Sequence, residues 1–225
     1  MLVRLVLQTV ISLAVQGAIL FLAADNWAWQ QGWAWLGEVG ALSAAISVWL
    51  YLNDEELLKA RLSSPFKRNQ RPADLAIIVA TVVVYGAWIA LMGLDAQRFF
   101  WSSAPLWAQI VGALLVGLGM MLVWETFRSN TFATTQVRVQ TERQQTVIDS
   151  GPYRYVRHPM YAGALLYLAG SPLVVGSLWG LAGSAIVMLC IAVRLLGEEK
   201  VLRADLPGYE AYTKATPWRL IPGVW

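Results

Sequence analysis

Residues 161–196 read YAGALLYLAGSPLVVGSLWGLAGSAIVMLCIAVRLL, an apolar run with a single charged residue near its end. A helix needs about 20 apolar residues to cross roughly 30 Å of hydrocarbon, so this run is too long for one crossing. Gly170, Pro172 and Gly176 interrupt it near the middle, and proline removes a backbone donor from a helix. We therefore expect a tight helical hairpin with a short first arm and a second arm over about Ser177–Leu196.

Four further apolar runs have the length of a membrane-spanning helix. They are Leu5–Ala24, Trp33–Leu52, Leu75–Leu94 and Leu106–Trp124. The chain is 57% hydrophobic and 14% charged, whereas soluble proteins are roughly 45–50% apolar and about 25% charged. The sequence therefore predicts an all-α fold, a polytopic transmembrane bundle of about five to six membrane helices that ends in a helical hairpin.

The basic residues test this topology, because lysine and arginine accumulate in cytoplasmic loops. All of the 17 except Arg98 fall in four segments that one orientation of the bundle places on the same side. These are Arg4; Lys59, Arg61, Lys67, Arg68 and Arg71; Arg128, Arg138, Arg143, Arg154 and Arg157; and Arg194, Lys200, Arg203, Lys214 and Arg219. The pattern predicts an integral multi-pass membrane protein with both termini cytoplasmic. The one-sided charge suits anionic membrane lipids and gives no argument for a nucleic-acid partner.

Two polar connections interrupt the apolar runs. Asn53–Asp74 carries acidic and then basic residues at helical spacing, which favours an interfacial helix, although a gate over a site is an alternative. Glu125–Met160 is much longer than a connection between two helices requires, and long ordered connections are usually functional. We therefore divide the chain into N-terminal transmembrane helices, 1–124, and a C-terminal region, 125–225, that carries the polar chemistry.

A candidate site lies where the second polar connection meets the hairpin. Tyr153, Arg157, His158 and Tyr161 crowd at the mouth of a membrane helix, where ionisable groups are costly unless they face a cavity or a partner. Pro159 is suited to a helix start, whose free N–H groups favour an anion. Taken singly, these residues also suit a capping histidine or side chains that snorkel to lipid headgroups.

The end of the hairpin supplies the other half of this site. A hairpin returns its end beside its beginning, so Arg194, Glu198 and Glu199 come back to the same mouth. Arg194 and Glu198 are four residues apart and share one helical face. As a surface pair they would contribute only about 0.2–0.5 kcal/mol, so contact with a ligand explains their position better than stability does.

Other catalytic signatures are missing from the sequence. There is no G-x-S-x-G, H-E-x-x-H or Walker lysine, and the single histidine and the single cysteine, Cys190, cannot build a conventional metal site. The pair Gly117-x-Gly119 lies inside an apolar helix and not after a strand. It predicts helix packing and no nucleotide-binding loop.

Three motifs in the C-terminal region resemble those of the isoprenylcysteine carboxyl methyltransferase family. They are GPYRYVRHPMYAG at Gly151–Gly163, RLLGEE at Arg194–Glu199 and GYEAY at Gly208–Tyr212. The resemblance covers roughly residues 130–222. It implies a pocket for S-adenosylmethionine on the cytoplasmic side, enclosed by the hairpin, the preceding loop and the tail. It also implies a tunnel through which a lipid-like or prenylated acceptor enters from the bilayer.

The resemblance also implies roles for individual residues. The cofactor shell would comprise Gln145, Thr146, Val147, Ile148, Tyr153, His158, Pro159, Met160, Tyr161 and Glu198. Arg194 would meet the acceptor. Gln145 stands where some relatives carry histidine, and Arg138 lies near a position where they carry glutamine, so contacts upstream of Gly151 are the least securely assigned.

The expected chemistry narrows the catalytic residues to Arg194, Arg157 and Glu199. A carboxylate acceptor needs no general base, only a cation that orients it, and Arg194 or Arg157 has the planar fork for this. An amine or thiol acceptor, such as a phospholipid amine or a small thiol, would need His158 or Glu199 as a base. A sterol-reductase-like enzyme that uses NADPH and a non-catalytic membrane scaffold are the remaining alternatives.

Overall fold

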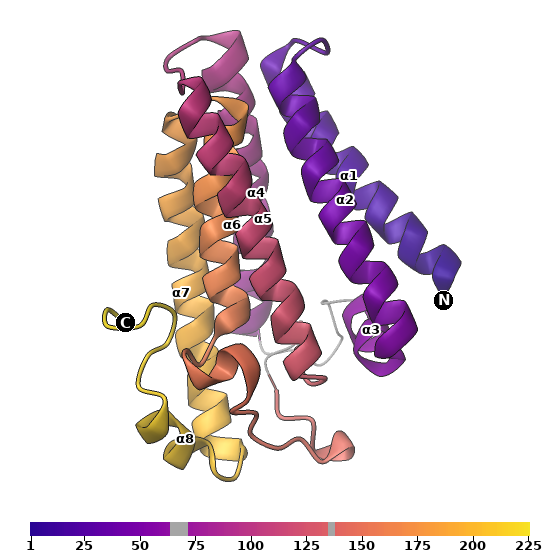
Figure 1. The fold of residues 1–225 in the computed structure, drawn as a ribbon, viewed down its shortest axis with the longest axis vertical. Helices are drawn as coiled ribbons and strands as arrows, with labels where there is room; N and C mark the ends of the chain where they lie inside the picture. The colour runs from indigo at the N-terminus through magenta and orange to yellow at the C-terminus, as the bar shows by residue number, and fades with distance from the viewer. Residues whose placement is uncertain (64–71, 135–137) are drawn as a thin grey trace.

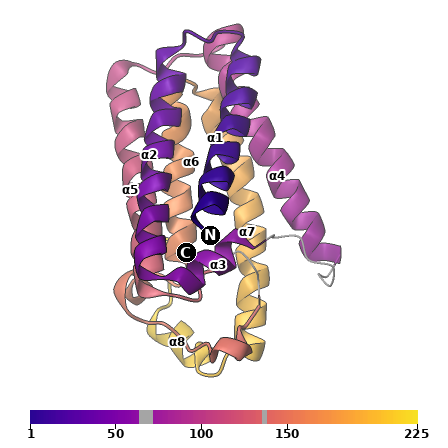
Figure 2. The same ribbon diagram turned by 90° about the vertical axis from the view of Figure 1, so that its right-hand side faces the viewer.

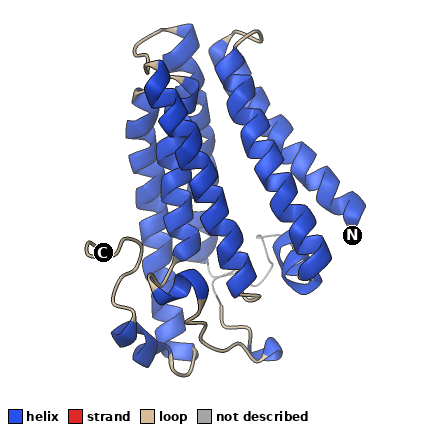
Figure 3. Cartoon of the chain, viewed as in Figure 1, coloured by secondary structure: helices blue, strands red, loops and turns tan. Residues whose placement is uncertain are grey.

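The structure is a computed structural model that describes residues 1–63, 72–134 and 138–225. The described part consists of helices and loops (Figure 3). In chain order the helices are α1 (Leu2–Ala24), α2 (Gln30–Asn53), α3 (Glu55–Leu62), α4 (Pro72–Gly93), the π-helical turn η1 (Leu94–Arg98), α5 (Leu106–Ser129), the 3₁₀ turns η2 (Thr141–Arg143) and η3 (Gly151–Arg154), α6 (Pro159–Val175), α7 (Trp179–Asp205) and α8 (Tyr209–Ala215).

Five of these helices are long and apolar enough to cross a membrane. They are α1, α2, α4 together with η1, α5 and α7. The sixth membrane segment, α6, is apolar but has only 17 residues. The predicted all-α, multi-pass bundle of five to six membrane helices is therefore confirmed.

The helices run up and down in two groups (Figure 1). α4, α5, α6 and α7 stand together, and the α1–α2 pair leans away from them at the end that holds the N-terminus. α1 packs on α4, and α2 packs on α5 and α6. Figure 2 shows α3, α8 and the loop after α5 together at one end of the bundle, which we call the polar end. The four segments of basic residues that we predicted to be cytoplasmic lie toward this end. Of their members, Lys67, Arg68 and Arg71 lie outside the described residues.

The first polar connection contains a short helix, as predicted. The side chain of Asp54 caps α3 by accepting a hydrogen bond from the Leu57 amide at 2.9 Å. Leu57, Leu58 and Leu62 are buried against the polar ends of α1, α2 and α5. Residues 64–71 of this connection lie outside the described part, so the gate that we considered for it stays untested.

The hairpin is present, but Pro172 does not interrupt its first arm. α6 continues through Pro172 to Val175 and ends at Gly176, whose φ of 84° is left-handed. A proline leaves the carbonyl four residues earlier without its helical donor. Here that carbonyl, on Leu168, accepts a hydrogen bond from the Ser184 hydroxyl of α7 at 2.6 Å. The neighbouring helix thus satisfies the freed group, which is how membrane helices tolerate proline.

α5 and α6 approach each other until their backbones touch, at two glycine pairs. A Cβ on Gly119 would lie 2.5 Å from the carbonyl oxygen of Gly163, and one on Gly112 would lie 2.7 Å from that of Gly170. The same is true from the other helix, where added Cβ atoms would meet the oxygens of Gly119 and Gly112. Small residues allow such close packing in membranes. The prediction that Gly119 serves helix packing agrees with this geometry.

We predict that Gly119→Ala destabilises the protein, because the new methyl group would collide with backbone that cannot move aside. Overpacking of this kind costs about 1–3 kcal/mol. Gly117→Ala is the matched control on the same helix, since its Cβ would meet only the Glu38 carboxylate at 3.8 Å. Thermal unfolding in detergent should show a lower midpoint for Gly119→Ala alone. Equal midpoints for the two variants would contradict the packing argument.

Candidate active site

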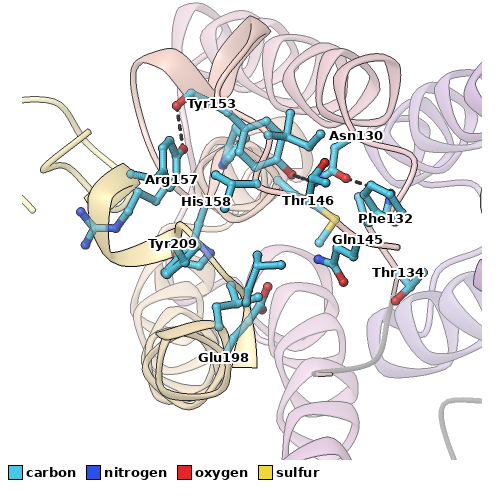
Figure 4. Close-up of a pocket in the computed structure, with 18 of the residues that line it drawn as sticks. Asn130, Phe132, Thr134, Gln145, Thr146, Tyr153, Arg157, His158, Glu198 and Tyr209 are labelled. Carbon is cyan, nitrogen blue, oxygen red and sulfur yellow. Dashed lines mark hydrogen bonds between the residues drawn. The ribbon is translucent and has the colours of Figure 1, made fainter. Parts of the chain in front are cut away.

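A cavity at the polar end collects the residues that the sequence singled out (Figure 4). Its free space is about 800 Å³, including the part open to solvent. All ten predicted cofactor residues line it: Gln145, Thr146, Val147, Ile148, Tyr153, His158, Pro159, Met160, Tyr161 and Glu198. Of the three predicted catalytic residues, Arg157 lines the cavity, whereas Arg194 and Glu199 do not.

The loop after α5 forms one wall because its own polar groups hold it in shape. The Asn130 amide donates to the Tyr153 hydroxyl at 2.8 Å and so ties the start of the loop to η3. Further along, the backbone amide of Gln140 donates to the Gln145 side-chain oxygen at 2.8 Å. The Gln140 side chain in turn donates to the carbonyl of Phe132 at 2.9 Å. Gln145 therefore both lines the cavity and supports its wall.

The turn before α6 is pressed against the end of α5. Gly151 has a φ of 57°, and a Cβ there would lie 2.2 Å from the Ser129 hydroxyl, so only glycine fits. This turn delivers Tyr153, whose carbonyl accepts a hydrogen bond from the Tyr212 hydroxyl of α8 at 2.7 Å. Burial raises the pKa of Tyr153 above its usual range, although the bond from Asn130 opposes the shift. The phenol therefore stays neutral.

Tyr161 connects α6 to both predicted polar residues of α7. Its hydroxyl donates to Glu198 Oε2 at 2.7 Å and accepts from Arg194 Nε at 3.2 Å. The convergence that we expected from the hairpin is therefore present. Glu198 faces the cavity, and Arg194 lies one helical turn closer to the middle of α7.

Glu199 belongs to a separate, buried cluster. Its Oε1 accepts from Arg157 Nε at 2.7 Å and lies 3.3 Å from His158 Nε2, and its Oε2 accepts from Arg219 Nε at 2.8 Å. Arg157 also donates to the carbonyls of Thr216 and Pro217. Arg157 and Glu199, which we predicted to be catalytic, thus hold the C-terminal tail.

Backbone hydrogen bonds join the same two segments. The amides of Arg157 and His158 donate to the carbonyls of Trp218 and Arg219, at 2.9 and 3.0 Å. The tail folds back over the polar end, as the family resemblance implied. Through these contacts it fixes the residues that immediately precede α6.

The comparisons with known proteins agree with this architecture. Residues 107–205, which span α5 to α7, match the sequence model of the phospholipid methyltransferase family. Over these residues the chain is similar to that family. Its fold resembles the eukaryotic intramembrane Ras methyltransferase, isoprenylcysteine carboxyl methyltransferase, with a TM-score of 0.50 and 15% identity over 93% of this chain and 74% of the other. At that identity the likeness concerns the fold alone. No curated protein matches the sequence.

Several residues that line the cavity were not predicted as cofactor contacts. They are Asn130, Phe132, Ala133, Thr134, Arg138, Val201, Leu202, Leu206, Tyr209 and Tyr212. Helical spacing could have found two of them, because Val201 and Leu202 follow Glu198 by three and four residues. The loop residues carry no such signal, since their placement depends on the local hydrogen bonds of the loop.

We predict that Glu199→Ala strongly destabilises the protein, because it leaves the buried Arg157 without its carboxylate. Removing one partner of a buried ion pair costs about 3–5 kcal/mol. Arg203→Ala is the control, since Arg203 and Glu210 form an exposed ion pair between α7 and α8. We expect Glu199→Ala to lower the unfolding midpoint and to expose the tail to limited proteolysis, and Arg203→Ala to change neither. Wild-type stability of Glu199→Ala would refute the structural role.

Proposed function

We propose that this protein transfers a methyl group from S-adenosylmethionine to the carboxylate of an isoprenylcysteine-like lipid in the membrane. The observation that carries the proposal is the hydrogen-bonded series Arg194–Tyr161–Glu198, which runs from the cavity toward the middle of α7. Glu198 would serve the cofactor and Arg194 the acceptor. The one-sided distribution of basic residues supports a cytoplasmic active site.

The lining of the cavity suits S-adenosylmethionine in chemistry. Ligand pockets combine apolar walls with a few placed polar groups. Val147, Ile148 and Leu202 offer apolar surface, and Glu198 offers a carboxylate for a cationic group. Among the described residues, the buried hydroxyl of Tyr209 has no hydrogen-bond partner. Burial raises the pKa of Tyr209 above its usual range, so this hydroxyl remains a donor that a ligand could satisfy.

The reaction requires little acid–base chemistry from the protein. The cofactor supplies a methyl group on a positively charged sulfur, and displacement needs nucleophile, methyl carbon and sulfur in line. Arg194 would orient the acceptor carboxylate, while Tyr161 holds the guanidinium of Arg194 in place. The tail and the apolar walls would keep water out of the site.

A phospholipid amine is the second candidate acceptor, because the matching family is described by phospholipid methylation. An amine must lose a proton during the reaction. His158 is the nearest candidate base, yet its ring is buried and lies 3.3 Å from a Glu199 oxygen that also accepts from Arg157. This arrangement favours a carboxylate, which is already ionised.

Calorimetry of the detergent-purified protein with S-adenosylhomocysteine tests the cofactor. We expect saturable binding and predict that Glu198→Ala weakens it about tenfold or more, as loss of a charged hydrogen bond of roughly 1.5–3 kcal/mol implies. Glu210→Ala, which removes an exposed carboxylate from α8, is the control and should bind normally. Binding of NADPH without binding of S-adenosylhomocysteine would favour a reductase and refute the methyltransferase cofactor.

Turnover with an isoprenylcysteine-like carboxylate tests the acceptor. We predict that Arg194→Ala keeps nearly normal affinity for S-adenosylhomocysteine but loses methyl transfer, because Arg194 is outside the cofactor cavity. Methyl release from a labelled cofactor measures the rate. Normal turnover by Arg194→Ala would show that the carboxylate assignment is wrong.

A further inference from the structure

A second cavity lies between α1, α2 and α5, with α3 at its polar end. Gln8, Ser12 and Gln16 line it from α1 at intervals of one helical turn, and Ser43 and Ser47 line it from α2. Polar side chains at membrane depth are costly unless they pair with one another, face water or meet a polar ligand. Gln16 donates to the Ser12 hydroxyl and accepts from Tyr85, and Gln8 donates to the Leu62 carbonyl, so the protein itself satisfies part of this polar wall. The cavity is therefore suited to an amphiphilic molecule and not to a hydrocarbon chain alone.

Arg61 of α3 lies at the junction of this cavity with the cofactor cavity. It lines the second cavity, and its Nη1 donates to the carbonyl of Ala133 at 2.8 Å and contacts Met160 Sδ at 3.8 Å. Ala133 and Met160 both line the cofactor cavity. Arg61 therefore contacts two residues of the cofactor cavity while it lines the second cavity.

The guanidinium of Arg61 lacks a counter-ion within the described parts of the chain. The ion pairs found there do not include it. It lies instead over the ring of Phe127, 4.3 Å from the centroid. Burial lowers the pKa of Arg61 to about 10, against the opposing effect of nearby Tyr161, so the group remains charged at neutral pH. A desolvated charge of this kind gains most from an anionic partner.

Other arginines near the two cavities have carboxylate partners, unlike Arg61 within the described residues. Arg157 and Arg219 share the carboxylate of Glu199, and Arg143 of the loop pairs with Glu56 of α3 at 3.0 Å. Arg61 is on the same short helix as Glu56, yet its side chain is directed to the cavities. The planar fork of a guanidinium matches the two oxygens of a carboxylate or a phosphate.

An apolar groove between α2 and α5 adjoins the second cavity. The two share Ile46 and Met120, and Trp49 and Trp124 line the groove near the polar end. An acceptor with its polar group at Arg61 could therefore place its hydrocarbon chain between these helices. The groove is accessible from the side of the bundle, where the bilayer would surround it.

We propose that Arg61 binds the oxyanion of the membrane-embedded acceptor, so that the N-terminal helices complete the active site. The inference rests on the proposed methyl transfer and identifies the acceptor as an anionic amphiphile, with a carboxylate or a phosphate as the recognised group. Arg61 would determine specificity through the charge of the headgroup, while Arg194 orients the reacting atom.

Direct binding of three lipid probes to the full-length protein in detergent tests this inference. The probes are a long-chain alkylthioacetic acid, its uncharged methyl ester and a dialkyl phosphate. We expect Arg61→Gln to weaken binding of at least one anionic probe about tenfold and to leave the ester unchanged, with Arg61→Lys intermediate. Arg4→Gln is the matched control, because Arg4 also serves α3, through the carbonyl of Leu62, without lining the second cavity. Preference of the wild type for the acid or for the phosphate identifies which oxyanion is the natural one.

Calorimetry with S-adenosylhomocysteine separates this role from a structural one. We expect Arg61→Gln to retain wild-type affinity. If Arg61→Gln lowers the affinity for S-adenosylhomocysteine as much as the affinity for the anionic probes, Arg61 supports the loop and the inference is overturned. The same holds if the variant loses as much affinity for the uncharged ester as for the anions. Unchanged binding of both anions would overturn it equally. Failure of the proposed function would show separately, as a wild-type protein that does not bind S-adenosylhomocysteine.

Discussion

At two glycine pairs, α5 and α6 pack backbone against backbone, and this contact determines where the polar chemistry can lie. The end of α5 at Ser129 and the start of α6 at Pro159 are held side by side, so the loop between them must leave and return to the same place. It folds beneath the bundle and forms a wall opposite α7. Gly151 fits at the end of this path because nothing larger than a hydrogen atom would clear Ser129.

Much of the cavity was predictable because its residues are close in sequence or related by the hairpin. The run from Gln145 to Tyr161 supplies nine of the ten predicted cofactor residues, and the return of α7 supplies Glu198. The hairpin turn was predicted near Gly170, Pro172 and Gly176, and it lies at Gly176. α6 continues through Pro172 because a hydroxyl on another helix, that of Ser184, replaces the missing donor. Arg61 was recognised only as a loop charge, since nothing in its neighbours specifies contact with Met160, 99 residues away.

The adjacent residues Glu198 and Glu199 show what a sequence pattern leaves undetermined. Neighbours on a helix point about 100° apart, so two acidic residues in a row can face different surroundings. Glu198 faces the cavity through Tyr161, and Glu199 faces the tail through Arg157 and Arg219. Which of the two directions each takes depends on how α7 is rotated against α6. That rotation is set by packing in the bundle, which no local motif records.

The two parts of the chain therefore contribute different contacts to the site. The segment that matches the family model, residues 107–205, contains most of the residues that line the cavity at the polar end. Acceptors differ, and discrimination between them requires a difference in binding free energy. A buried charge such as Arg61 on α3 provides a large difference in binding free energy from a single side chain.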